Sequence, residues 1–146
     1  VQSIVYRESA GPDAALSPPT AGPAHVDLEG WSSHRMVIPS EPLLFRFSAL
    51  TFNSHRIHYD LPYAREEERY RGLVVHGPLT AILLLDLARR ALGDNALTSF
   101  AFRGLSPAIC GEAVHLVMRG SGNDIEMGAY AGDGRQIMAA SAQGHN

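Results

Sequence analysis

Lysine is absent from this chain of 146 residues, and all twelve basic side chains are arginine. Fifteen acidic residues give a formal charge of -3, and no basic stripe of the kind needed to bind nucleic acid is present. A single cysteine, Cys110, excludes an internal disulfide and a metal site built on cysteines. There is no apolar run of roughly 18 residues and no N-terminal targeting signal of basic and apolar residues. We therefore expect a cytoplasmic protein that binds neither nucleic acid nor membranes.

The chain is long enough for one domain with a substantial core, since 45% of its residues are hydrophobic. Residues 1–7 have the composition of a strand, but residues 9–30 are rich in Pro, Gly, Ala and Ser and show no apolar period. A lone strand needs a partner for its backbone groups. We expect residues 1–30 to be a stray strand plus a linker, and residues 31–146 to form the domain.

Three segments have helical patterns. Residues 43–52 follow a start signal that contains Pro42, residues 62–69 form a short charged segment, and residues 78–92 are apolar on nearly every side. A helix of the last kind must be surrounded by protein. At about 22 Å it is too short to span a bilayer and suits the centre of a small domain.

Strand patterns dominate the second half of the chain. Residues 35–38 read as an edge strand that Pro39 closes, and four further strands are predicted at residues 96–105, 112–119, 124–131 and 135–141. Glycine-rich segments at residues 120–123 and 132–134 fit hairpin turns. Helices followed by an antiparallel meander indicate an α+β domain, and the simplest packing wraps the sheet around the buried helix.

Asn53 and His58 form the first candidate pair. A separation of five residues on one continuous helix places them about 140° apart, so they can share a site only if the helix ends near Asn53 and the chain turns. His58 can then act as an acid or base near neutral pH, while the Asn53 amide both donates to and accepts from a water. The alternative is that His58 is structural and Asn53 caps a helix.

Residues 75–78, Val-His-Gly-Pro, form the second candidate site. Gly77 permits close approach of a ligand to the backbone, Pro78 suits the first turn of a helix, and the free N–H groups there carry the positive end of the helix dipole. Such an end suits the oxygen of a polarised thioester. Ordinary helix capping is the alternative interpretation.

Together the two segments resemble the MaoC-like, hot-dog-fold hydratases and dehydratases, which act on acyl-CoA or acyl-carrier thioesters. The resemblance covers residues 31–141, and it is strongest to the branch of mesaconyl-CoA hydratase and the fatty-acid-synthase-like dehydratases. Two runs carry it: Phe-Arg-Phe-Ser-Ala-Leu-Thr-Phe-Asn at residues 45–53 and His-Arg-Ile-His-Tyr-Asp at residues 55–60.

The resemblance implies a long central helix wrapped by a curved antiparallel sheet. It also implies that His58 and an acidic residue hold the catalytic water, and that the N–H of Gly77 receives the thioester carbonyl. Asn53 stands where the broader family has Asp, so His58 would carry the proton while Asn53 orients the water. We expect a further set of residues to contact the substrate: His55, Arg56, Tyr59, Val75, His76 and Pro78.

A single hot-dog sheet leaves one edge unfinished, so we expect a homodimer or a pairing with a second hot-dog half. Two other functions stay open, namely a hot-dog thioesterase and a non-catalytic binding or scaffolding half. Histidines 55, 58 and 76 lack a carboxylate or cysteine that would complete a metal site. We expect neither a metal nor another cofactor.

Overall fold

The computed structural model describes residues 3–4, 8, 10–19 and 25–145. Its centre is a five-stranded antiparallel sheet in the order β1-β3-β4-β5-β2. The strands are β1 (Ser33–Val37), β2 (Leu97–Gly104), β3 (Val114–Ser121), β4 (Asp124–Ala131) and β5 (Gln136–Gly144). Strands β1 and β2 form the two edges.

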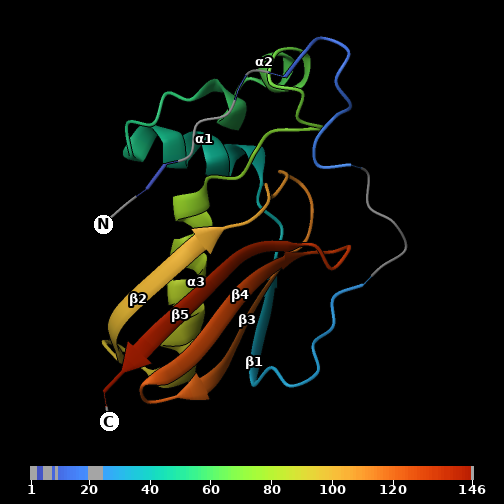
Figure 1. Ribbon diagram of the computed structural model, residues 1–146. Helices are drawn as coiled ribbons and strands as arrows, with labels where there is room; N and C mark the ends of the chain where they lie inside the picture. The colour runs from blue at the N-terminus through green and yellow to red at the C-terminus, as the bar shows by residue number, and fades with distance from the viewer. Residues whose placement is uncertain (1–2, 5–7, 9, 20–24, 146) are drawn as a thin grey trace.

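The long helix α3 (Gly77–Leu92) lies along one face of this sheet. The shorter helices α1 (Glu41–Leu50) and α2 (Leu61–Glu66), with the single turn η1 (Arg56–His58), gather at the end of the sheet where α3 begins (Figure 1). The start of α3 therefore lies next to segments that come from several earlier parts of the chain.

The core forms where α3 meets the sheet. Leu84 of α3 is fully buried, as are Leu116 on β3 and Ala129 on β4. Alternate residues of β4 and β5 point toward this core, so the sheet presents one apolar face to the helix. The arrangement confirms the predicted α+β class and the central helix packed against an antiparallel sheet.

The helices and strands predicted for residues 31–146 are present among the described residues, and most of their ends differ by a few residues. Helix α1 begins at Glu41 because Pro42 fits its first turn, and it ends at Leu50. Helix α2 ends at Glu66 and is shorter than predicted; beyond it the N–H of Glu68 donates to the carbonyl oxygen of Tyr63, and Arg69 has φ 58. The turn η1, which holds His58, was not predicted.

Part of the predicted linker packs on the domain. Ser17 pairs with the backbone on both sides of Tyr70, and the guanidinium of Arg69 donates to the carbonyl oxygen of Ala14. Arg71 contacts Pro19 and forms an ion pair with Glu112. Most of the predicted N-terminal strand, residues 1–7, lies outside the described residues, so that prediction stays a prediction.

Candidate active site

The chain leaves α1 through a sharp turn that places Asn53. Phe52 has φ 53, and the N–H of Asn53 donates to the carbonyl oxygen of Ser48 at 2.9 Å. The side-chain oxygen of Asn53 accepts the backbone N–H of His55 at 3.0 Å. The helix thus ends before Asn53, as the predicted pairing of Asn53 with His58 requires. Within the described part of the chain, the amide NH₂ of Asn53 has no hydrogen-bond partner.

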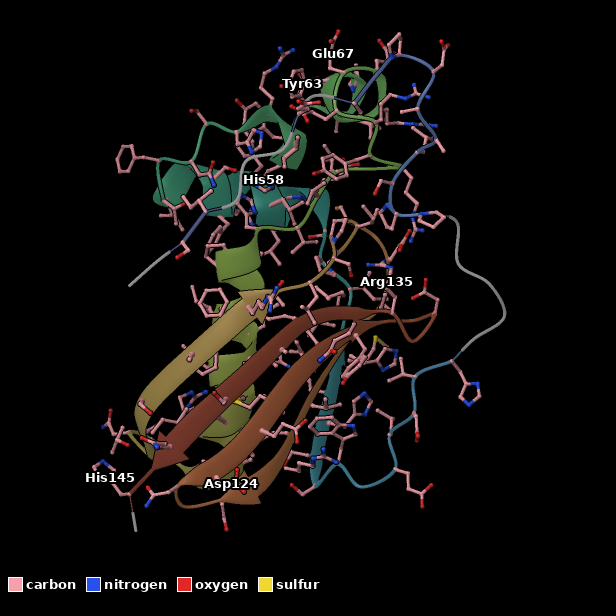
Figure 2. All side chains as sticks on the ribbon, in the orientation of Figure 1. His58, Tyr63, Glu67, Asp124, Arg135 and His145 are labelled. Atoms are coloured by element: carbon pink, nitrogen blue, oxygen red, sulfur yellow. The ribbon has the colours of Figure 1, made fainter. Side chains whose placement is uncertain are left out.

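His58 is held with one ring nitrogen committed to the protein. Nδ1 lies 2.7 Å from the carbonyl oxygen of Val74, and because a carbonyl only accepts, Nδ1 carries the proton. Nε2 has no protein partner among the described residues and is not sealed from solvent. Figure 2 shows His58 between α1 and the beginning of α3. Nε2 is therefore the atom that can gain or lose a proton.

The environment of His58 favours its neutral form. Burial lowers its pKa below the usual 6.5, and the nearby ring of His55, whose centroid is 5.7 Å away, lowers the pKa further. The hydrogen bond to Val74 opposes this change in part. At neutral pH His58 is consequently an unprotonated base.

His76 lies flat against His58, with ring centroids 3.6 Å apart and planes inclined by 18°. Its Nε2 is 2.8 Å from the hydroxyl of Ser48, and Phe47 packs edge-on against the ring. The side chain is 1% exposed, and its Nδ1 has no partner among the described residues. Burial, followed by the neighbouring His58, lowers the pKa of His76 to about 4, so its ring stays neutral.

The backbone N–H of Gly77 points out of the helix. The carbonyl of His76 accepts the N–H of Thr80 at 3.1 Å and so points along the helix axis. In a trans peptide the N–H points opposite to the carbonyl, so the N–H of Gly77 projects from the N-terminus of α3. Apart from His76, Pro78 and the backbone of α3, no described atom lies within 4 Å of the place where a Cβ of Gly77 would be, so the space beside this residue is open.

A cavity of about 350 Å³ is lined by two residues of this network, Ser48 and Asn53, and not by His58, His76 or Gly77. Its walls are mainly apolar and come from α1 and the loop that follows: Phe45, Ser48, Ala49, Phe52, Asn53, Ser54 and Tyr59. Ser48 and Asn53 are thus both in the wall of the cavity and in the hydrogen-bond network around the histidines. Such a cavity can receive a mainly apolar acyl group.

Arg56 and Tyr59, two of the predicted substrate-binding residues, make their contacts within the chain. Arg56 forms an ion pair with Asp60 and lies over the ring of Tyr63, 4.1 Å from its centroid. Tyr59 donates its hydroxyl to the carbonyl oxygen of Ser54 and lines the cavity. Arg56 is therefore already engaged within the chain.

Val75 and Pro78 hold the backbone on either side of the His76–Gly77 peptide. The N–H of Val75 donates to the carbonyl oxygen of Ala108, and Pro78 occupies the first turn of α3. The described part of the chain contains no cluster of three or more His, Cys, Asp or Glu placed to bind a metal ion.

Ser48 is a site residue that the sequence reasoning missed. It is 6% exposed and lies four residues after the fully buried Leu44, on the same face of α1. A serine on the buried face of an amphipathic helix needs a hydrogen-bond partner, and that rule was the available signal. The partner, His76, lies 28 residues further along the chain.

A long helix on a five-stranded antiparallel sheet, with this site at the start of the helix, defines a hot-dog domain. The solved structure of the (R)-hydratase from A. caviae has the same fold, with a TM-score of 0.66 at 17% identity over 75% of this chain and 89% of that one. The family model for hydroxyacyl-thioester dehydratase type 2 matches residues 1–110. The chain belongs to that family.

Two curated relatives are longer than this chain. Mesaconyl-C(4)-CoA hydratase of Chloroflexus aurantiacus is 44% identical over 97% of this chain, which covers 49% of that protein. The mitochondrial hydroxyacyl-thioester dehydratase type 2 of Schizosaccharomyces pombe is 36% identical over 58% of this chain, which covers 29% of that protein. The chain spans half or less of the length of these relatives. No helix among the described residues is long and apolar enough to cross a membrane.

Proposed function

We propose that this chain carries the catalytic site of a hydratase or dehydratase that adds water to, or removes it from, the double bond of an enoyl thioester. One observation supports this most strongly. His58 has Nδ1 fixed on Val74 and Nε2 free, next to the open N-terminus of α3 at Gly77. A base and an oxyanion donor are thus held near each other by the same few residues.

In the hydration direction, Nε2 of His58 takes a proton from water as the water oxygen bonds to the β-carbon of the enoyl group. The electron pair of the double bond moves toward the thioester oxygen, where the N–H of Gly77 and the helix dipole stabilise the negative charge. His58 then returns the proton to the α-carbon, which gives the 3-hydroxyacyl thioester. Dehydration is the reverse of these steps.

Asn53 orients the water in this scheme. Its side-chain oxygen is occupied by the N–H of His55, which leaves the NH₂ group to donate to the water oxygen. An amide cannot take a proton from water at neutral pH, so His58 carries the proton alone. The lowered pKa of His58 is consistent with a base that is unprotonated at neutral pH.

The substrate we propose is an acyl-CoA, with a mesaconyl-CoA-like acyl group as the first candidate. The match to the Chloroflexus aurantiacus hydratase, at 44% identity, covers 97% of this chain. The cavity beside Asn53 has the apolar walls that a short acyl chain requires. A thioesterase is less well supported. Asp86, the carboxylate of α3, accepts from Arg35, Arg89 and Arg90, and these bonds lower its pKa to about 2.

We also propose that the domain works as a pair, either as a homodimer or with a second hot-dog half. Strand β2 is an open edge, and Phe102 on it and Leu105 just beyond it are about half exposed. The coverage of half of the Chloroflexus relative fits either arrangement. A paired sheet would satisfy the free backbone groups of β2.

Hydration of crotonyl-CoA and mesaconyl-CoA tests the proposal. The protein is assayed in its natural length and assembly, and the loss of the enoyl thioester is followed together with the release of free thiol. Loss of the enoyl signal without thiol release is the expected result. Thiol release would indicate a thioesterase, and no reaction with either substrate would indicate a non-catalytic half.

A further inference from the structure

Ser48 makes two contacts that join separate parts of the site. Its backbone carbonyl oxygen accepts the N–H of Asn53 at 2.9 Å, and its hydroxyl bonds Nε2 of His76 at 2.8 Å. Asn53 belongs to the turn after α1, whereas His76 is the residue that precedes α3. One buried serine thus connects the proposed water-orienting group to the start of the central helix.

His76 in turn contacts both other parts of the site. Its ring supports His58 across 3.6 Å, and its peptide bond to Gly77 contains the N–H that projects toward the open space. The carbonyl of that residue is held by the N–H of Thr80. A rotation of the His76 side chain would therefore remove the support of the His58 ring at the point where the backbone turns into α3.

We propose that the hydrogen bond between Ser48 and His76 is a positioning link, which holds Asn53, His58 and the N–H of Gly77 in one working arrangement. Neither Ser48 nor His76 exchanges a proton with the substrate. This inference rests on the proposed hydratase function of the site.

The buried surroundings of His76 fit such a role. The ring has one hydrogen bond, an unpartnered Nδ1 and aromatic contacts with Phe47 and His58. With a pKa of about 4 the ring stays neutral while His58 exchanges protons, so the two stacked rings are not both charged. The other titratable side chain facing His58 is His55.

Ser48→Ala removes the link with the loss of one oxygen atom. We expect kcat to fall about tenfold with KM little changed, the size that loss of one buried hydrogen bond supports. We also expect the pKa of His58, followed by NMR of labelled histidine, to rise toward 6.5 as its ring becomes more hydrated. Thr51→Ala is the matched control. Thr51 is the residue that caps the C-terminus of α1, and its hydroxyl donates to the carbonyl oxygen of Phe47 within that helix.

Two changes at His76 separate the hydrogen bond from ring stacking. His76→Phe keeps a ring against His58 but cannot bond Ser48, whereas His76→Gln can reach Ser48 but loses the ring. We expect His76→Phe to reproduce the effects of Ser48→Ala, and the double variant to be no worse than either one. We expect His76→Gln to keep the turn at Asn53, while the ring of His58 loses the ring of His76 that packs against it.

The outcomes decide the proposal in distinct ways. An unchanged pKa of His58 in Ser48→Ala, equal losses in Thr51→Ala, or additive losses in the double variant would each overturn the positioning link. A parent protein without hydration activity would sink the proposed function, while the NMR comparison of parent and Ser48→Ala would still decide the link between the two residues.

Discussion

Replacement of His58 by alanine removes Nε2, an imidazole nitrogen without a partner among the described residues, which is the proposed base. Positioned proton transfer contributes about 100-fold to 10,000-fold to a rate, so the loss in kcat/KM should be at least about 100-fold, or roughly 2.7 kcal/mol in the barrier. The carbonyl of Val74 also loses its donor, which costs roughly 1–3 kcal/mol if it stays unsatisfied. The second effect acts on folding, so activity and stability must be measured together.

His58→Phe is the matched control for packing. A phenyl ring fills the place between His55 and His76 but offers no nitrogen. We expect both variants to lose hydration of the enoyl-CoA to the same extent, and His58→Phe to unfold at the higher urea concentration. Residual activity close to the parent in either variant would refute the role of His58 as the base.

The pH profile of the parent gives an independent test of the same assignment. Hydration needs unprotonated Nε2, and burial lowers the pKa of His58 below 6.5. The value of kcat/KM should be constant near neutral pH and should decrease only below pH 6.5, with a limiting slope of about tenfold per pH unit. An acidic limb centred above 6.5 would contradict the buried, neutral base.

Three further predictions concern other groups of the site. Gly77→Ala should fold normally, because outside its chain neighbours and the backbone of α3 no described atom lies within 4 Å of the added Cβ. Gly77→Val should lower kcat by about 100-fold or more with unchanged circular dichroism, since the larger side chain blocks the oxyanion donor. Asn53→Ala should lower kcat by about tenfold with a modest change in KM, and Asn53→Asp should match or exceed the parent, because a carboxylate can accept the proton; an inactive Asn53→Asp would contradict this scheme. Burial lowers the pKa of His76 to about 4, so protonation of His76 destabilises the folded protein. Its contribution to the free energy of unfolding is therefore fully present above pH 6.5. As the pH falls from 6.5 to 4, roughly 3 kcal/mol of this stability should be lost, which urea unfolding at several pH values measures, and His76→Phe should lose less.

The fold was accessible from the sequence because its main signals are local. A helix over residues 78–92 is apolar on nearly every side and so must be buried. Alternating apolar and polar residues in the later strands, with glycine-rich turns between them, indicated an antiparallel meander. Strand β4 was predicted at its observed ends. The order of the strands, with β2 beyond β5 at the edge, depends on long-range pairing and was not predicted.

The site was predictable only in part. Asn53, His58 and Gly77 were proposed because each lies in a short run with a recognisable pattern, and their catalytic roles stay predictions. The turn that separates Asn53 from α1 is present. The stacking of His58 on His76 was not found, since the two are 18 positions apart and meet only through tertiary packing. His76 was predicted to contact the substrate only because of its place in the Val-His-Gly-Pro run. Its burial depends on packing against Phe47 and Ser48, which lie far from it in the sequence.

The origin of the site residues bears on what a second hot-dog half would supply. The proposed base, water-orienting amide and oxyanion donor all come from residues 48–77, and the hydrogen bonds that fix them, from Ser48 and Val74, lie within the same range. The cavity, in contrast, is walled on the described side only by residues of α1 and the loop after it. A coenzyme A thioester is much larger than a cavity of about 350 Å³. A partner or a second half would therefore complete the binding surface for the rest of the substrate, and substitutions there should change KM and substrate choice more than the proton-transfer step.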